Sequence, residues 1–286
     1  MKIKLSRNIL LPALQASNNV VERRQALPIL SNLLIQTQKN NVRLTATDLE
    51  VELRSNCVAL EATDGNIALP ARKLFDICRA LPSEAEITIE NGGNKTKVTS
   101  GRSRFSLATM KAEDFPSIGS FDSLVTFKIE KEAFLDVLES TLFAMAHQDV
   151  RYYLNGLLLE LESKQIRAVA TDGHRLALSE TNVSIDMEKP SQYIIPRKGV
   201  MEIVRLLAGS PEDIVVNIGE NHLSVDGGSQ SLTTKLVEGA FPDYNRVIPR
   251  DSLCTIVADR EMLRAGLGRA SILSNEKFRG VRLLLK

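Results

Sequence analysis

The sequence predicts an α+β protein made of repeated domains, each with two helices packed on largely antiparallel sheets. The first observation behind this prediction is an internal repeat, because segments of residues 1–122 recur in the same order within 126–249. The second is the order of patterns in each copy, where two stretches with helical apolar spacing stand among short alternating stretches. Together they predict two complete copies at 1–122 and 126–249, and the incomplete start of a third at 250–286.

Each copy opens with a short strand followed by a helix. The segment "IKLSRNILLPALQ" at 3–15 aligns with "FKIEKEAFLDVLE" at 127–139. In both segments, alternation gives way to apolar residues at the spacing of one helix face. We therefore expect helices over 7–20 and 130–147.

Strands and a tight turn follow the first helix of each copy. Two further pairs of segments align: "LSNLLI" (30–35) with "LNGLLL" (154–159), and "ATD" (46–48) with "ATD" (170–172). Strands are expected on both sides of the first "ATD", at 43–47 and 50–59. Because Asp-Gly is a strong turn dipeptide, Asp172 and Gly173 predict a turn between two strands.

A second helix and a hairpin complete each copy. "ARK" at 71–73 aligns with "PRK" one repeat later and opens a helix, predicted at 72–81 in the first copy. Strands at 86–90 and 95–99 are joined by "ENGGNK", whose glycines supply the positive φ that hairpin turns need. "SRFSLATM" at 103–110 alternates like a strand and is expected at a sheet edge.

The third copy repeats only the opening. "TIVADREMLRAGL" at 255–267 has the same strand-then-helix pattern, which predicts an apolar helix over 259–273. Gly280 then stands in the place of Gly156. Because so short a unit cannot cover its own hydrophobic face, we expect that face to be exposed.

Composition excludes several classes of protein. The net charge is +1, from 36 basic and 35 acidic residues, so total charge gives no sign of nucleic-acid binding. No apolar run approaches the roughly 18 residues of a membrane span, and the basic start is a poor signal peptide. Cys57, Cys78 and Cys254 lack the spacing of a disulfide framework or a zinc site. The sequence predicts a cytoplasmic protein with no metal, no cofactor and no membrane contact.

Local charge is more informative than total charge. Three helix-forming stretches, 7–24, 71–82 and 196–208, each carry three basic residues against one acidic residue. The stretch 130–147 breaks the trend, because acidic residues dominate it. A solvated face explains any one of the three basic stretches. Three together favour one lining surface that meets phosphates without reading bases.

The stretch "ATDGHRLALSE" has the residue types of an active site. A catalytic interpretation uses His174 as base and Asp172 as its orienting partner. It lacks a nucleophile, because no GxSxG motif occurs, and His147, His174 and His222 have no metal-ligand spacing. The same frame occurs at 46–53 without a histidine, which favours architecture. A hydrolase or transferase that uses Asp172 and His174 remains the alternative function.

Six strings stand in one order along the chain: "GRSRFSL", "HQDVRYYLNG", "TDGHRLAL", "PRKGV", "FPDYNRVIPR" and "SNEKFRGVRL". They closely resemble the bacterial DNA polymerase III beta subunit, the sliding clamp, and the resemblance runs the length of the chain. It implies a non-catalytic subunit of the replicative polymerase with three similar domains. Two subunits close head to tail into a ring, and helices line the hole around double-stranded DNA. The third domain is incomplete here, so we expect the chain as given not to close a stable ring.

The resemblance also implies three sets of site residues. A hydrophobic pocket would receive short peptides from polymerase catalytic subunits, the clamp loader, mismatch repair proteins and other proteins with a clamp-binding motif. The pocket residues would be Arg151, Tyr152, Tyr153, Leu154, Thr171, Gly173, His174, Arg175, Leu176, Pro242 and Val247. The DNA contacts would be Arg24, Gln148, Arg197 and Lys198. The interface with a second copy would use Lys73, Ile77, Leu81, Phe105, Leu107, Ile272 and Leu273.

Overall fold

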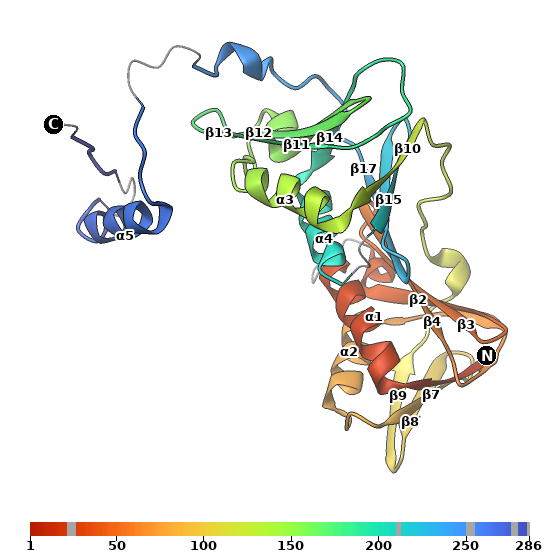
Figure 1. Cartoon of the computed structure of the whole chain (residues 1–286). Coiled ribbons are helices and arrows are strands. Elements are labelled where there is room, and N and C mark those ends of the chain that lie inside the picture. Colours follow the sequence, from red (N-terminus) through yellow and green to blue (C-terminus); the bar gives the residue numbers. More distant parts are fainter. Residues whose placement is uncertain (22–26, 210–212, 250–254, 276–279, 285–286) are drawn as a thin grey trace. The chain divides into compact units, whose positions relative to one another are not determined.

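The computed structural model describes residues 1–21, 27–209, 213–249, 255–275 and 280–284 (Figure 1). The chain divides into two compact units, Met1–Phe241 and Pro242–Lys286. Every strand of the described residues belongs to the larger unit. The predicted third-domain start therefore lies within the smaller unit, and the predicted boundaries near 122 and 126 lie inside the larger one.

The first half of the larger unit follows the predicted order of strand, helix, strands, helix and strands. Its elements are β1 (Lys2–Ser6), α1 (Arg7–Val20), β2 (Asn32–Gln38), β3 (Asn41–Thr47), β4 (Val51–Val58), β5 (Glu61–Thr63), β6 (Gly65–Pro70), α2 (Ala71–Ala80), β7 (Glu86–Asn91), β8 (Lys95–Ser100) and β9 (Ser103–Ala108). Short 3-10 helices η1 (Pro28–Ser31) and η2 (Ala112–Asp114) lie between them.

The second half repeats this order. Its elements are β10 (Val125–Glu130), α3 (Lys131–Leu142), η3 (Tyr152–Asn155), β11 (Gly156–Glu162), β12 (Gln165–Thr171), β13 (Leu176–Asn182), β14 (Ser191–Pro196), α4 (Arg197–Leu207), β15 (Asp213–Ile218), β16 (His222–Asp226) and β17 (Gln230–Lys235). Apart from the short β5, each strand and helix of the first half has a counterpart here.

The sheets show the same correspondence. The first half forms one sheet in the order β5-β1-β7-β8-β9 and a second row β4-β3-β2-β6. The second half forms β10-β15-β16-β17 and β13-β12-β11-β14. All strand neighbours run antiparallel, as the sequence predicted. The pairing of β17 with β4 joins the two halves into one eight-stranded sheet.

The helices pack on these sheets through equivalent residues. Leu10 and Leu14 on α1 and their counterparts Phe134 and Leu138 on α3 are fully buried or nearly so. Burial of each such side chain contributes about 1.5–3 kcal/mol, more than the roughly 0.7 kcal/mol over which the helix propensities of ordinary residues vary. Figure 1 shows α3, α4, α1 and α2 following one another along one side of the unit. The repeat therefore places all four helices on one common face.

Two local predictions can be compared directly with the structure. The turn in "ENGGNK" is confirmed, because Gly93 has φ +93° between β7 and β8. The helix expected over 130–147 is wrong at its end, since α3 stops at Leu142. There the Thr141 hydroxyl donates to the Val137 carbonyl at 2.9 Å, and the backbone continues in tight turns. The apolar spacing beyond Leu142 comes from those turns.

The smaller unit contains η4 (Tyr244–Arg246) and α5 (Arg260–Ser271). The Asp259 carboxylate caps α5 by accepting the N–H of Met262 at 2.8 Å. Met262 and Leu263 are 75% and 46% exposed, so the predicted helix forms with its apolar face uncovered within the unit. None of the described helices is long and apolar enough to cross a membrane.

Candidate functional site

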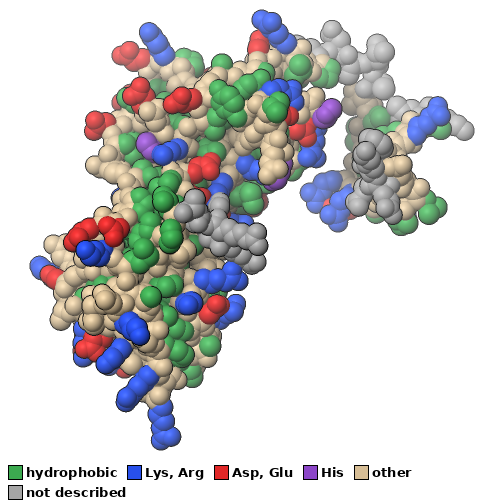
Figure 2. Space-filling view, turned by 180° about the vertical axis from the view of Figure 1, so that it is seen from behind, with side chains coloured by type: hydrophobic (Ala, Val, Ile, Leu, Met, Phe, Trp, Pro, Cys, Tyr) green, Lys and Arg blue, Asp and Glu red, His purple; other side chains and the backbone are tan. Residues whose placement is uncertain are grey.

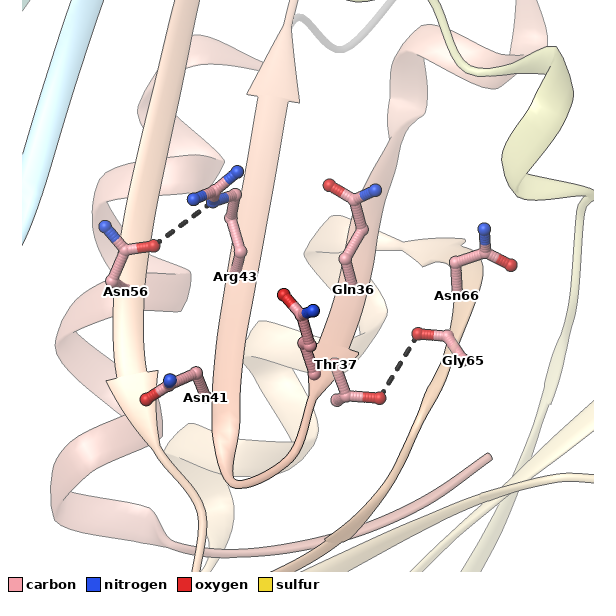
Figure 3. Close-up of a pocket in the computed structure, with 8 residues that line it drawn as sticks. Gln36, Thr37, Asn41, Arg43, Asn56, Gly65 and Asn66 are labelled. Atoms are coloured by element: carbon pink, nitrogen blue, oxygen red, sulfur yellow. Dashed lines mark hydrogen bonds between the residues drawn. The ribbon is translucent and has the colours of Figure 1, made fainter.

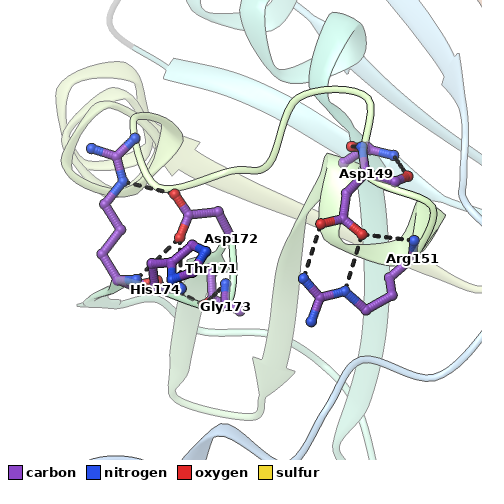
Figure 4. A network of polar contacts seen from close by, with 8 residues as sticks. Asp149, Arg151, Thr171, Asp172, Gly173 and His174 are labelled. Atoms are coloured by element: carbon purple, nitrogen blue, oxygen red, sulfur yellow. Dashed lines mark hydrogen bonds and ion pairs between the residues drawn. The ribbon is translucent and has the colours of Figure 1, made fainter. Parts of the chain in front are cut away.

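The turn between β12 and β13 is built by the side chains of Thr171 and Asp172 (Figure 4). The Thr171 hydroxyl donates to the Arg175 carbonyl at 2.7 Å and accepts the Gly173 N–H at 3.0 Å. One oxygen of Asp172 accepts the N–H groups of His174 and Arg175 at 2.9 and 3.0 Å. Gly173 has φ +87°, a backbone conformation that suits glycine.

The same turn occurs between β3 and β4. The Thr47 hydroxyl donates to the Val51 carbonyl at 2.8 Å, and Asp48 accepts the N–H groups of Glu50 and Val51 at 2.9 and 2.7 Å. Leu49 adopts φ +79° where the later turn has Gly173. The Thr-Asp frame therefore forms the same turn in both halves of the larger unit.

Asp172 does not orient a catalytic histidine. Its second oxygen accepts Nε of Arg175 at 3.1 Å. Partial burial opposes its charged form, but the backbone N–H groups of His174 and Arg175 and the Arg175 guanidinium outweigh this and lower its pKa. The guanidinium also lies over the ring of Phe143, 5.5 Å from the ring centroid. The Asp172 carboxylate is occupied by the backbone of the turn and by Arg175. It therefore does not orient His174 as a catalytic base.

The loop before η3 brings Arg151 to this turn (Figure 4). The Arg151 guanidinium donates from Nε and Nη2 to the two oxygens of Asp149 at 3.0 and 2.9 Å. Hydrogen bonds from Arg151 lower the pKa of Asp149 to about 2. A Cβ on Gly173 would stand 3.1 Å from Nη2 of Arg151, so the guanidinium lies directly against the glycine.

The other predicted pocket residues of the larger unit surround this contact. Leu154 is buried, Thr171 and Leu176 are half-buried, and His174 and Arg175 are exposed. Tyr152 is exposed and Tyr153 half-buried, and their rings meet edge to face with centroids 5.9 Å apart. The remaining two predicted residues, Pro242 and Val247, belong to the smaller unit, where both are exposed.

Three of the four predicted DNA contacts line one hollow. Gln148, Arg197 and Lys198 surround a space of about 710 Å³ that also includes Tyr152 and Met201. The fourth predicted contact, Arg24, lies outside the described residues. Arg197, Lys198 and Met201 place this hollow beside the first turns of α4.

Lys198 also makes a contact that the sequence did not suggest. Its ammonium forms an ion pair with Asp48, whose side chain is only 4% exposed, and also donates to the Val20 carbonyl at 3.4 Å. This contact joins α4 of the second half to the turn of the first half. The repeated Thr-Asp frame was the one sequence feature that pointed toward this ion pair. It predicts that the Asp48 carboxylate is held in a turn, but it does not predict which residue pairs with it.

The predicted interface residues lie on α2, on β9 and beside α5. Lys73 is exposed, Ile77 and Leu81 are half-buried, Phe105 is 38% exposed and Leu107 is 6% exposed. Ile272 and Leu273 follow α5 in the smaller unit and are 75% and 95% exposed. Within the described residues β9 has β8 as its one neighbour, so it lies at a sheet edge as predicted.

Other surfaces of the described chain offer no catalytic arrangement. A hollow of about 360 Å³ on β2, β3, β4 and β6 is lined by side-chain amides, with Arg43 donating to Asn56 at 3.3 Å (Figure 3). No cluster of three or more metal-ligating side chains occurs among the described residues. Figure 2 shows basic and acidic side chains interspersed on the face that it presents. These surfaces of the described residues fit a binding function better than a catalytic one.

Comparison with known proteins gives a consistent result. Residues 1–119 match the model of the DNA polymerase III beta subunit, N-terminal domain, and residues 128–243 match that of the central domain. The chain is 47% identical over 287 residues to the beta sliding clamp of Pseudomonas putida, covering 100% of the chain and 78% of that protein. It is 45% identical over 284 residues to that of Escherichia coli, covering 99% and 77%.

Solved structures agree with the sequence matches. A sliding clamp from Pseudomonas aeruginosa bound to griselimycin superposes with a TM-score of 0.96 at 45% identity, covering 100% of this chain and 78% of that one. The Caulobacter crescentus pol III beta structure gives a TM-score of 0.90 at 34% identity, covering 96% and 76%.

Proposed function

The chain belongs to the family of bacterial DNA polymerase III beta subunits, the sliding clamps, and we propose that its domains form part of a head-to-tail ring around double-stranded DNA. Members of this family are non-catalytic processivity factors of the polymerase, which removes the alternative of a hydrolase or transferase. A ring that holds polymerase on DNA acts in the cytoplasm, where the bacterial chromosome lies.

The observation that carries the ring proposal is the joint between the two halves. β17 of the second half pairs edge to edge with β4 of the first half. Their counterparts, β9 and β13, are the terminal strands of their rows within the described residues. Repeating the observed joint at both edges adds one domain at each end of the pair. Edge-to-edge addition of this kind can continue until a ring closes, and a closed ring leaves neither the β9 edge nor the β13 edge unpaired.

Phe105 shows how the joint would continue. The registers β7–β8–β9 and β15–β16–β17 make Phe105 the counterpart of Leu232, since Val98 pairs with Phe105 and Val225 with Leu232. Leu232 pairs with Leu53 across the joint and is 1% exposed, whereas Phe105 is 38% exposed. We therefore assign Phe105 to the contact with a second copy. Lys73, the counterpart of Lys198, would meet a buried carboxylate there in the same way.

The turn and the loop beside it would form the peptide-binding pocket. Leu154 and Leu176 supply apolar walls, the Tyr152–Tyr153 pair supplies a broad aromatic rim, and Arg151 supplies hydrogen-bond donors. Such a pocket suits an extended peptide with Leu and Phe anchors. The proposed partners are polymerase catalytic subunits, the clamp loader, and mismatch repair and other proteins with a clamp-binding motif.

A fluorescent peptide with Leu and Phe anchors tests the pocket. We expect saturable binding to the chain, and a loss of about tenfold or more in Leu176→Asp, because the substitution places a charge among apolar walls. Leu178→Asp is the matched control, since Leu178 lies on the same strand and is 38% exposed. Equal loss in both variants would contradict the pocket.

DNA would be held without sequence readout. Gln148, Arg197 and Lys198 present polar and basic groups around the hollow beside α4, and Arg24 is the fourth proposed contact. Phosphate contacts of this kind are insensitive to base sequence and weaken with salt. Binding of two duplexes of unrelated sequence over a range of salt concentrations tests this. We expect equal affinities with one negative salt slope, and a strong preference for either duplex would contradict the proposal.

A further inference from the structure

Asp149 belongs to none of the predicted sites, yet it fixes the side chain of Arg151. Its carboxylate accepts Nε and Nη2 of Arg151 at 3.0 and 2.9 Å and also the Arg151 N–H at 2.8 Å. Its backbone is held by Asn155, which accepts the Asp149 N–H and donates to the Asp149 carbonyl, both at 2.9 Å. The carboxylate that holds Arg151 is therefore itself anchored to η3.

Gly173 provides the surface on which the guanidinium lies. A Cβ at Gly173 would approach Nη2, Nη1 and Cζ of Arg151 at 3.1, 3.3 and 3.6 Å. The first two distances are tighter than an ordinary contact and the third is an ordinary contact, so the guanidinium covers the open side of the glycine. Asp149 holds the guanidinium from one side and the turn supports it from another. Arg151 thus joins the loop before η3 to the Thr171–Arg175 turn.

The position leaves donors for a ligand. Among the described residues, Nη1 of Arg151 has no acceptor, and the side chain is 48% exposed. Asp149 neutralises the charge of Arg151, and Asp172 pairs with Arg175 beside it. With both arginines neutralised, the remaining donors favour a hydrogen-bond acceptor over net negative charge. A main-chain carbonyl of an extended peptide is such an acceptor.

We propose that Asp149 is a positioning residue, which holds Arg151 over Gly173 so that Arg151 binds a main-chain carbonyl of the partner peptide. The proposal rests on the peptide-binding pocket proposed above. It adds a division of labour: the apolar walls select the anchor side chains, and the Asp149–Arg151 pair fixes the peptide backbone. Because every residue carries a carbonyl, the pair accepts peptides that differ in sequence outside their anchors.

A double-mutant cycle tests whether Asp149 acts through Arg151. Binding of an uncharged, amidated Leu-Phe peptide is measured for the chain and for Asp149→Asn, Arg151→Met and the double variant. Each single variant should bind about threefold to tenfold more weakly, as expected for the net contribution of one partly exposed hydrogen bond. The double variant should bind no more weakly than Arg151→Met alone. Asp76→Asn, which breaks the exposed pair with Arg79, is the matched control and should bind normally.

A second peptide separates backbone recognition from charge recognition. It carries an acidic residue and a free carboxyl terminus, and it should bind the chain within about twofold of the uncharged peptide. A preference of tenfold or more that disappears in Arg151→Met would overturn the carbonyl assignment. Additive losses in the cycle, or unchanged binding in Asp149→Asn, would overturn the positioning role. Failure of the unmodified chain to bind either peptide would instead overturn the pocket, and this inference with it.

Discussion

Replacing Lys198 with methionine removes its contact to Asp48 together with any contact to DNA, and unfolding of the chain without DNA measures only the first. The Asp48 side chain is 4% exposed and keeps its two backbone N–H donors in the variant, but it loses its only ion-pair partner among the described residues. Breaking a fully buried pair costs about 3–5 kcal/mol. Lys198 is 24% exposed and Asp48 stays hydrogen-bonded, so we expect about 1–3 kcal/mol here.

The assay is thermal and urea unfolding of the chain followed by circular dichroism. Lys198→Met should lower the melting temperature by about 2–10 °C, the shift that such a loss gives in a protein of this size. Arg197→Met is the matched control, because within the described part of the chain Arg197 donates only to the Met145 carbonyl, at 3.2 Å. It should cost about 0.5–1.5 kcal/mol.

A neutral partner supplies the decisive comparison. In an Asp48→Asn background the loss of Lys198 leaves no buried charge unpaired, so Lys198→Met should cost clearly less than it does alone. Both Met variants should still weaken DNA binding and reduce its salt slope. Equal destabilisation by the two Met variants, or full additivity with Asp48→Asn, would refute the assignment of Lys198 to the joint.

Three other expectations concern the edge strand, the Asp149–Arg151 pair and the cysteines. Phe105→Ser should destabilise the chain by about 1 kcal/mol, whereas Leu232→Ser, its counterpart in the β17–β4 joint, should cost about 3 kcal/mol or more; equal costs in urea unfolding would show that β9 is already covered. The pKa of Asp149 falls from 3.8 to about 2, so its contact with Arg151 is complete above the ordinary pKa and is lost as pH falls through the lowered one. The NMR signal of Arg151 Nε–H should therefore stay constant from neutral pH down to the ordinary pKa, and movement in the neutral range would contradict the pairing. Burial raises the pKa of Cys57 and Cys78 to about 11, so neither should react with iodoacetamide at neutral pH in the folded chain, and mass spectrometry that found rapid alkylation of either would contradict their burial.

Local patterns in the sequence were sufficient for the repeat and for most of its elements. Leu10 and Leu14 predicted the buried face of α1, and the repeat carried that prediction to Phe134 and Leu138 of α3. The Asp172-Gly173 turn followed from turn chemistry alone. These features depend on residues within a few positions of one another, which is the range over which periodicity and turn propensity act.

Contacts between distant segments were beyond that reasoning. Nothing in the pattern of β4 or β17 states that the two strands pair, because alternation defines the faces of a strand but not its neighbour. The ion pair of Lys198 with Asp48 spans the two halves, and a helix-opening lysine is equally consistent with solvent exposure. Asp149 was not predicted for a different reason. It holds Arg151, whose position depends on a glycine in another turn, Gly173.

Mapping a bound peptide by NMR tests the central claim most directly, because the chain carries its own control. The Thr171–Arg175 turn and the Thr47–Val51 turn share one hydrogen-bond pattern, but only the later turn lies beside Leu176 and Arg151. Titration with an unlabelled Leu-Phe peptide should shift the signals of Leu154, Gly173 and Leu176 and leave those of the Thr47–Val51 turn unchanged. Shifts at both turns, or none at the later one, would contradict the assignment of this stretch as the peptide-binding site of a clamp.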